Sequence, residues 1–323
     1  MVVGAGVIGL TTAICLAEAG LATAVIAAAP PAATTSAAAG AIWGPVRCGP
    51  AGRCRGWAAT GLEVLSALAA EPGSGAHQLA GQEVSARPAT PPDWTDLLPD
   101  TRLLGPDELP GGCAAGWRFT APAVSMPVYL DYLLRRYHQQ GGSVTTATVT
   151  SLAAVPAPVV VNCTGPGART LVPDPALVPV RGQVVIAENP GITEFYLDHR
   201  GGAADYVYLF PHDDVVVLGG TAHEGASDLA PRPEVTDRIL ADCAAVVPAL
   251  RGARVITARV GLRPVRPEVR LEAEALPDGR VLWHNYGHGG AGVTLSWGCA
   301  RELTTGLTTG LTTGSPAHPG YSG

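Results

Sequence analysis

The sequence predicts an α/β fold in which a parallel sheet is interrupted by an inserted lobe. A short strand, a glycine-rich turn, a helix and a second strand occupy residues 1–27. A strongly apolar strand at 159–161 runs into another glycine turn, as buried parallel strands do. Between them, residues 72–118 are rich in proline and glycine and show only short strand patterns. We therefore expect one parallel sheet assembled from segments that lie far apart in the sequence.

The composition of the 323 residues indicates a globular protein and excludes several chemistries. Hydrophobic residues make up 47% and charged residues 15%, a balance that excludes intrinsic disorder. All 21 basic residues are arginines, so neither a lysine Schiff base nor the lysine of a phosphate-binding P-loop is available. The net charge is −6 and no basic stripe appears, which argues against nucleic acid as a partner.

Cysteine usage and hydropathy indicate the compartment. No stretch reaches about 18 apolar residues and no charged-then-apolar leader is seen, so we expect a cytoplasmic protein that does not bind membranes. The seven cysteines are odd in number and scattered, which predicts free thiols rather than a disulfide framework. Cys48 and Cys54 form the one close pair, but no further ligands complete a zinc site, and no metal is expected.

The first glycine turn, GAGVIG at residues 4–9, has the GxGxxG spacing of a Rossmann-like dinucleotide site. Gly4 permits the tight turn, Gly6 lets a pyrophosphate approach the backbone, and Gly9 lets the helix pack closely on the strand. The helix N-terminus then faces the anion. The alternative is a glycine-rich turn in an alanine-rich chain.

The remaining patterns predict the other elements in order. They are a helix at 8–19 ending at Gly20, a strand at 22–27, a helix at about 55–70, a helix at 126–140 capped by Ser125, strands at 143–149, 181–187, 206–210 and 215–219, a helix at 233–247, strands at 254–260 and 281–283, and a last helix ending near Leu303. Three Leu-Thr-Thr-Gly repeats follow at 303–314, and we expect this tail to be frayed.

Longer motifs show a family resemblance. The runs GAGVIGLTTA, TTSAAAGAIWGP, VVVNCTGPGAR, PVRGQVV, YLFPHDDVVVLGGT, GLRPVRPEVRLE and HNYGHGGAGVT occur in the order seen in FAD-dependent D-amino-acid oxidases, which the chain resembles over residues 2–303. The resemblance implies a Rossmann-like FAD-binding domain made of residues 1–45, 142–182 and 271–323. It also implies a discontinuous, mostly antiparallel substrate-binding and interface domain made of 46–141 and 183–270.

The resemblance also implies the cofactor contacts. They are Gly4, Gly6, Val7, Ile8, Gly9, Thr34, Thr35, Ser36, Gly40, Ala41, Ile42, Val149, Thr164, Gly289, Gly290, Ala291, Gly292, Val293 and Thr294. The hydroxyls at 34–36 can donate to phosphate, although such loops are often merely turns. Residues 289–294 begin the last helix, whose N-terminus would stabilise negative charge on the flavin pyrimidine.

A D-amino acid presents a carboxylate, and the planar fork of an arginine binds a carboxylate with two parallel bonds. Spacing alone leaves Arg263, Arg266 and Arg270 as candidates, the last two also fitting surface pairs with nearby glutamates. The resemblance favours Arg263, with Tyr208 adding a hydroxyl and Gly290 offering its carbonyl to the substrate amine. Tyr206, two residues before Tyr208, points to the same face of its strand, in line with the two-residue period of strands.

The histidines are interpreted as structural. His284 and His288 flank the last glycine loop, and we expect them to form hydrogen bonds, because direct hydride transfer from Cα needs no base. His199, His212 and His223 are predicted to lie on the surface, and no pair has metal-ligand spacing.

Three departures from the family pattern stand out. Ala28 and Ala29 occupy positions where the family usually has charged residues near the adenosine, which implies weak FAD affinity. Trp283 replaces an aliphatic residue. The segment before Tyr208 is short and has Ala204 where a lid tyrosine would stand, which implies an open entrance.

The resulting hypothesis is FAD-dependent oxidation of a D-amino acid by oxygen to a 2-oxo acid, ammonia and hydrogen peroxide. A homodimer is the expected assembly. Ile42, Trp43 and Phe210 offer apolar walls, and Gly290 leaves no hydroxyl, so neutral side chains should be preferred. The alternatives are a D-aspartate oxidase, with Arg200 meeting the second carboxylate, a glycine- or sarcosine-type amine oxidase, or a flavin-deficient relic without activity.

Overall fold

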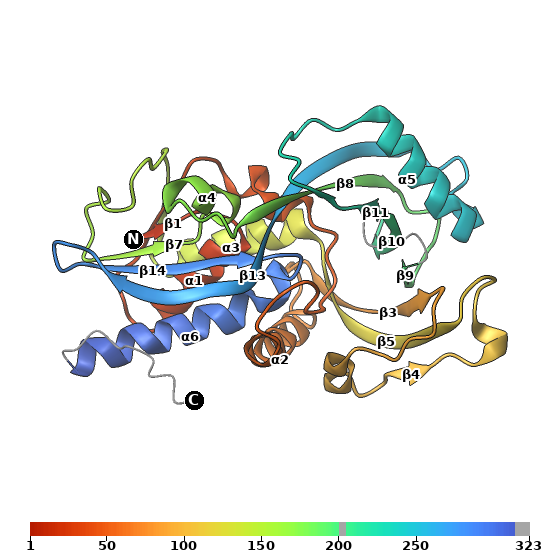
Figure 1. Ribbon diagram of the computed structural model, residues 1–323, viewed down its shortest axis with the longest axis horizontal. Helices are drawn as coiled ribbons and strands as arrows, with labels where there is room; N and C mark the ends of the chain where they lie inside the picture. Colours follow the sequence, from red (N-terminus) through yellow and green to blue (C-terminus); the bar gives the residue numbers. More distant parts are fainter. Residues whose placement is uncertain (200–204, 314–323) are drawn as a thin grey trace.

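The computed structural model describes residues 1–199 and 205–313, with no side chains described at 205 and 311–313. These residues form one sheet of 14 strands, in the order β4-β5-β3-β9-β10-β11-β8-β13-β14-β7-β1-β2-β6, with β12 (His223–Glu224) beside β8. Figure 1 shows that the sheet divides into two parts, which meet where β8 and β13 pass from one to the other. The two parts differ in strand direction.

The parallel part contains the N-terminal unit. Its strands are β1 (Val2–Val3), β2 (Ala24–Ala27), β6 (Ser143–Thr146), β7 (Val159–Asn162) and β14 (Val281–His288), and each runs parallel to its neighbours within this part. Its helices are α1 (Val7–Glu18), α3 (Met126–Gln139), the short α4 (Ala168–Leu171) and α6 (Gly292–Thr313), with α2 (Ala51–Leu68) packed on α6. Helix α1 packs against both α3 and α6. This arrangement confirms the predicted parallel sheet built from distant segments.

The antiparallel part contains the inserted lobe. Its strands are β3 (Ala76–Ser85), β4 (Arg102–Leu103), β5 (Ala115–Val124), β8 (Val178–Glu188), β9 (Phe195–Asp198), β10 (Asp205–His212), β11 (Val215–Thr221) and β13 (Val255–Ala275). Only β3 and β9 pair in parallel here. Helix α5 (Pro233–Val246) covers β8, β10 and β11. The lobe at 72–118 therefore contains the ten-residue β3 and the beginning of the ten-residue β5, rather than only short strands.

Strand β13 is much longer than the predicted strand at 254–260. The strand contains two prolines, in the run RPVRP; Pro264 lies opposite Pro179 of β8, and the register shifts between Val265 and Arg270. Beyond this irregularity β13 pairs with β14. An edge or bulge position tolerates proline because no ladder hydrogen bond is lost there. The bulge thus lets one strand join the two parts of the sheet.

The prediction of a frayed tail after Leu303 is wrong as far as residue 313, because α6 continues through the repeats. The four-residue repeat places Leu303 and Leu307 on one helical face, and both are buried. The threonine hydroxyls donate to carbonyls one turn earlier, as Thr304 does to Ala300 at 2.8 Å. The part of the predicted tail beyond residue 313 lies outside the described residues.

Other predicted limits needed small changes. Strand β2 begins at Ala24 rather than residue 22, β6 ends at Thr146 rather than 149, and α2 begins at Ala51 rather than 55. Gly20 has the expected left-handed conformation after α1, with φ of 79°. No helix among the described residues is both long and apolar enough to cross a bilayer.

Candidate functional site

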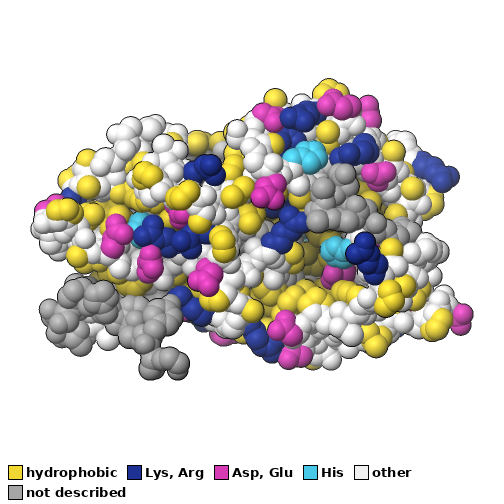
Figure 2. Space-filling model, in the orientation of Figure 1, with side chains coloured by type: hydrophobic (Ala, Val, Ile, Leu, Met, Phe, Trp, Pro, Cys, Tyr) yellow, Lys and Arg dark blue, Asp and Glu magenta, His cyan; other side chains and the backbone are white. Residues whose placement is uncertain are grey.

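One cavity of about 1000 Å³ lies where the two parts of the sheet meet. It is lined by the β1–α1 turn, by residues 33–44, by the loops after β6 and β7, and by strands β10, β13 and β14. Figure 2 shows a hollow right of centre, with hydrophobic side chains inside it and charged side chains at its rim. A cavity of this size is at the upper end of those that hold cofactors and small molecules.

Most of the predicted cofactor residues line this cavity together. They are Gly4, Gly6, Val7, Ile8, Thr34, Thr35, Ser36, Gly40, Ala41, Ile42, Val149, Thr164, Gly289, Gly290, Gly292, Val293 and Thr294. Gly9 and Ala291 do not line it. Ala291 is buried in the core, and Gly9 lies against the strand-to-helix turn. The predicted substrate residues Arg263, Tyr208 and Gly290 line the same cavity.

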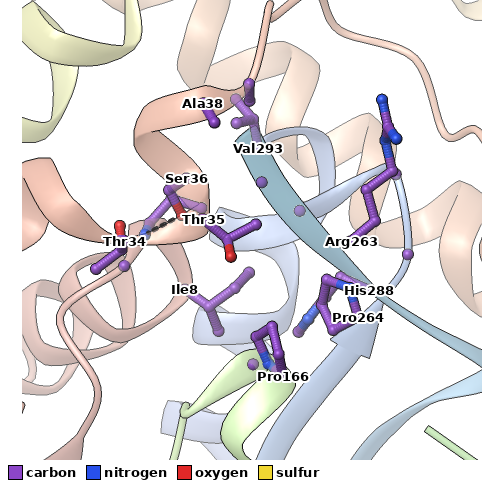
Figure 3. A pocket seen from close by; sticks show the side chains of 18 of the residues that line it. Ile8, Thr34, Thr35, Ser36, Ala38, Pro166, Arg263, Pro264, His288 and Val293 are labelled. Carbon is purple, nitrogen blue, oxygen red and sulfur yellow. Dashed lines mark hydrogen bonds between the residues drawn. The ribbon is translucent and has the colours of Figure 1, made fainter. Parts of the chain in front are cut away.

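The β1–α1 turn depends on close backbone packing. Gly4 has φ of 113°, and a Cβ on Gly9 would lie 1.9 Å from the Gly4 carbonyl oxygen. Only glycine fits such an approach, which is the packing role expected for the third glycine of the motif. The backbone N–H of Val7 at the start of α1 donates to Ser36 Oγ at 3.0 Å. Figure 3 shows Thr34, Thr35 and Ser36 beside this turn, on the other side of the cavity from Arg263.

The part of the cavity next to β2 and β6 has no charged side chain among the residues that the structure describes. Ala28 and Ala29 line it after β2, and Thr148 and Thr150 line it after β6. The charged or histidine residues among those lining the cavity are Arg47, Glu83, His199, Arg263 and His288. None of these five belongs to the N-terminal βαβ unit or to the loops after β6 and β7. A ligand at this end is therefore held by backbone groups, hydroxyls and apolar contacts.

The loop before α6 is held by its own hydrogen bonds. The N–H of Gly289 donates to the Pro264 carbonyl at 2.9 Å. Thr294 Oγ1 accepts from the N–H of Gly44 at 3.0 Å and donates to its carbonyl at 3.1 Å. The Thr294 hydroxyl thus joins α6 to the segment before α2, while Gly289, Gly290, Gly292 and Val293 line the cavity.

Arg263 is the one of the three candidate arginines that lines the cavity. Its guanidinium lies over Gly182 of β8, where a Cβ would come within 2.3 Å of Nη1. Nη1 donates to the Thr221 carbonyl at 3.1 Å and Nη2 to the Tyr206 hydroxyl at 3.4 Å. These contacts leave further N–H groups of the fork, which has five donors.

Arg266 and Arg270 have structural partners instead. Arg266 Nε lies 2.9 Å from Asp174 Oδ2, and Arg270 pairs with Glu272 and Glu274. The expected surface pairing with nearby glutamates is confirmed for Arg270. It is wrong for Arg266, because its carboxylate partner is the buried Asp174, which lies 92 positions away in the chain.

Tyr208 is buried, and its ring lies directly over Gly219, its cross-strand partner on β11. The rings of Tyr206 and Phe210 flank it, with centroids 5.6 Å and 4.9 Å away. Burial raises the pKa of Tyr208 well above its usual value, so the phenol stays protonated and can donate a hydrogen bond. Tyr206 also lines the cavity, as its period-two spacing predicted.

The histidines divide into three environments. His288 lines the cavity, and burial lowers its pKa to about 3, so it is neutral at pH 7, and its Nε2 has no partner among the described residues. His284 is buried, with Nδ1 3.3 Å from the amide nitrogen of Asn162, in keeping with a structural role. His223 is half-buried outside the cavity.

The surface prediction for His212 is wrong. The side chain is buried, its Nε2 lies 2.7 Å from the Gly40 carbonyl oxygen, and burial lowers its pKa to about 4. The signal was present in the sequence, because His212 continues the period-two face of Tyr206, Tyr208 and Phe210.

Several lining residues were not predicted. His199, expected on the surface, lines the cavity beside Glu83, and Arg47, Trp94 and Phe119 also reach it. Glu83 lies on β3 and His199 follows β9, two strands that pair in parallel. No local pattern marks these positions, since the cavity face of β3 is set by its pairing with β5 and β9. Arg200 and Ala204, named in the sequence analysis, lie outside the described residues.

The residues present fit a flavin dinucleotide. A Cβ at Gly4 or Gly9 would overlap neighbouring backbone atoms. The N-terminus of α1 lines the cavity with Gly6, Val7 and Ile8. The start of α6 opens into the same cavity from another side. Two helix N-termini and a glycine turn can hold a pyrophosphate and the electron-rich edge of a flavin ring.

Comparison with known proteins agrees with this geometry. Residues 1–305 match the family of FAD-dependent oxidoreductases. The chain is similar to D-amino-acid oxidase of Rubrobacter xylanophilus, with 48% identity over 94% of this chain and 93% of the relative. It is 46% identical to D-amino-acid oxidase of Streptomyces coelicolor over 94% of both chains. The fold is shared with glycine oxidase from Bacillus cereus, at a TM-score of 0.77, 18% identity and 99% coverage of both chains.

Proposed function

The chain belongs to the family of FAD-dependent oxidoreductases, and we propose that it is a D-amino-acid oxidase. Such an enzyme converts a D-amino acid, oxygen and water to a 2-oxo acid, ammonia and hydrogen peroxide. The observation that carries the proposal is that the dinucleotide-type glycine turn and the Arg263–Tyr208 pair line one cavity. When bound, FAD supplies the hydride acceptor for the substrate Cα–H.

We assign the two ends of the cavity to different ligands. Residues of the parallel part would hold FAD, with the predicted cofactor domain at 1–45, 142–182 and 271–323. Residues of the antiparallel part would hold the substrate, with the predicted domain at 46–141 and 183–270. This division is supported by the neutral lining next to β2 and β6 and by the charged lining contributed by β3 and β13.

Arg263 and Tyr208 would bind the substrate carboxylate. The guanidinium is already oriented by Thr221 and Tyr206, so little side-chain freedom is lost on binding. The protonated phenol of Tyr208 adds a third donor. Because Tyr208 is buried and Arg263 is half-buried, each charge-assisted bond should be stronger than it would be at the surface.

Gly290 would accept a hydrogen bond from the substrate amine through its backbone carbonyl. A glycine leaves this backbone open to close approach, since the nearest atom to a Cβ there is the Val46 carbonyl oxygen at 3.4 Å. His288, which precedes this loop, is neutral at pH 7. It therefore adds no positive charge that would oppose the positive charge developing on the substrate Cα and amine as the hydride leaves. With the carboxylate and amine both held by these residues, the substrate Cα–H would be positioned for transfer without a general base.

The apolar lining supports neutral side chains as substrates. Ile42, Trp43, Phe119 and Phe210 border the cavity, and a second carboxylate buried against them would be costly. We therefore expect a higher kcat/KM for neutral D-amino acids than for D-aspartate. If D-aspartate is preferred by tenfold or more and Arg200→Ala removes that preference, the chain is a D-aspartate oxidase instead.

The decisive experiment is anaerobic reduction of the purified holoenzyme. D-alanine should bleach the yellow flavin spectrum, L-alanine should not, and readmitted oxygen should restore the colour with formation of hydrogen peroxide. Bleaching by glycine or sarcosine but not by D-alanine would indicate the other class of amine oxidase. A protein that binds no added FAD would be the flavin-deficient relic.

We also propose that the enzyme acts in the cytoplasm and forms a homodimer, as the sequence analysis expected. Cell fractionation and light scattering of the purified protein would test these two points.

A further inference from the structure

A carboxylate and an imidazole meet in the cavity wall away from the residues proposed to bind the α-carboxylate. His199 Nε2 lies 2.8 Å from Glu83 Oε1, while Glu83 Oε2 accepts from Trp117 Nε1 at 3.2 Å. The Glu83 side chain is 11% exposed and the His199 side chain 45% exposed. The carboxylate is therefore the inner member of the pair, and the imidazole is the outer one.

The pair is connected to Arg263 through Tyr206. The Tyr206 ring lies nearly parallel to the His199 ring, at 21° and 6.2 Å between centroids, and its hydroxyl accepts from Arg263 Nη2. All three side chains line the cavity. Tyr206 thus lies between His199 and Arg263, the residue proposed to bind the α-carboxylate. We expect a substrate side chain to lie along this wall of the cavity.

The bonding leaves one ring nitrogen of His199 for a ligand. Nε2 is committed to Glu83, and the described residues provide no hydrogen-bond partner for Nδ1. The groups facing the ring are Glu83 on β3, Asp198 at the end of β9, Arg47 from the loop before α2 and Tyr206 on β10. The bond to Glu83 favours the imidazolium and, with Asp198, raises the pKa of His199 above its usual value, whereas burial and Arg47 oppose this.

We propose that His199 determines side-chain specificity, by donating a hydrogen bond from Nδ1 to the carbonyl oxygen of a neutral substrate side chain. This inference rests on the proposed function and names its substrate class, D-amino acids whose neutral side chain carries a carbonyl group. Because Glu83 keeps the proton on Nε2, the proton lost on deprotonation is the one on Nδ1. Nδ1 is then a donor at low pH and an acceptor at high pH.

The first test compares D-asparagine with D-leucine, which has nearly the same shape but no oxygen in its side chain. In His199→Phe the ring stays and the donor is lost, so the ratio of kcat/KM for D-asparagine to that for D-leucine should fall about tenfold. His223→Phe, which removes a histidine outside the cavity, is the matched control and should leave the ratio unchanged. An unchanged ratio in His199→Phe would overturn the proposal.

The second test measures how this ratio of kcat/KM values depends on pH. A purely structural role of His199 would not make the ratio depend on pH. In the wild type the same ratio should decrease as pH rises through the pKa of His199. Glu83→Gln removes the anion that favours the imidazolium, so the midpoint of this decrease should move down by about one pH unit or more. A midpoint that stays in place in Glu83→Gln, or a ratio independent of pH in the wild type, would contradict the proposal.

Binding of unreactive acids separates this inference from the proposed function. Succinamate and isocaproate correspond to D-asparagine and D-leucine without the amine, and their binding to the holoenzyme can be followed by flavin absorption. His199→Phe should weaken succinamate relative to isocaproate about tenfold even if no D-amino acid is oxidised. Equal weakening of both acids would overturn the role of His199, whereas failure to oxidise any D-amino acid would overturn only the proposed function.

Discussion

The two ends of the cavity are built in opposite ways. Next to β2 and β6 the wall consists of glycine backbone, alanines and hydroxyl residues, and its main feature is the turn between β1 and α1. At the other end the wall is made of large side chains, with Arg263, Tyr208, Glu83 and His199 supplied by four different strands or strand ends. The first end can hold its ligand by backbone geometry, and the second by side-chain charge.

This contrast extends to the role of glycine. In the parallel part Gly4 and Gly9 bring backbone close to backbone. In the antiparallel part Gly182 and Gly219 make room for the Arg263 guanidinium and the Tyr208 ring. The same residue type therefore shapes a turn at one end and positions functional side chains at the other. Substitutions at the two ends should consequently affect different properties.

The largest effect is expected from Arg263→Ala. Removing one partner of a desolvated charge pair costs about 2–5 kcal/mol, so kcat/KM for D-alanine should fall by a factor of about 30 to several thousand. The flavin should remain bound, because Arg263 belongs to the substrate end. Arg254→Ala, an exposed arginine paired with Glu188, is the control. Near-normal kcat/KM in Arg263→Ala would refute the proposal that Arg263 binds the substrate carboxylate.

The next largest effects are expected from two alanine substitutions, one at each end of the cavity. Gly219→Ala would place a Cβ 2.0 Å from Tyr208 Cζ, and Gly9→Ala would place one 1.9 Å from the Gly4 carbonyl oxygen. Each overlap should cost about 1–3 kcal/mol. We expect Gly219→Ala to raise KM with FAD retained, and Gly9→Ala to lose FAD.

Gly56→Ala is the control for these two variants, since it lies in α2 with no atom within 4 Å of the new Cβ. KM and the FAD dissociation constant are the measurements. Loss of FAD from both cavity variants would show that the ends are not independent.

A smaller effect is expected from acid. Burial lowers the pKa of His212 to about 4, so the unfolded chain binds more protons between the usual histidine pKa and this value. The contribution of the neutral His212 to the free energy of unfolding is therefore fully present above the histidine pKa of the unfolded chain. It is lost as the pH falls below that value, by about 1–2 kcal/mol between about pH 7 and about pH 5. His212→Gln should reduce this loss. The difference in thermal midpoint between the two pH values is the measurement, and an equal difference in variant and wild type would argue against His212.

The smallest effect concerns salt. Among the described residues no charged side chain lines the cavity next to β2 and β6, so the FAD dissociation constant should change less than about twofold between about 0.05 M and about 0.5 M salt. A carboxylate inhibitor at Arg263 should show the larger salt dependence.

The absence of charge near Ala28 and Ala29 should also let FAD leave on dilution. Retention of FAD through gel filtration at nanomolar protein would contradict the weak affinity.

The sequence was informative wherever an interaction is local. The β1–α1–β2 unit, the left-handed Gly20 and the start of α3 all depend on residues within a few positions of one another. The longer motifs extended this to the cavity, because the resemblance favoured Arg263 where spacing alone left three arginines open. Trp283, a departure from the family, is explained only by the structure, since it packs against Gly306 of α6.

Tertiary structure alone decided the contacts between distant strands. His212 is buried, α6 continues through its repeats, and Glu83 meets His199 across 116 positions of the chain. Local patterns cannot specify these features, because which face of β3 borders the cavity depends on its pairing with β5 and β9. The sequence by itself determined the turn that fits a dinucleotide, whose geometry is contained in six consecutive residues. The charges around the substrate end were decided only when distant strands came together, because β3, β13 and the end of β9 each contribute a single charged or histidine side chain to a site that none of them defines alone.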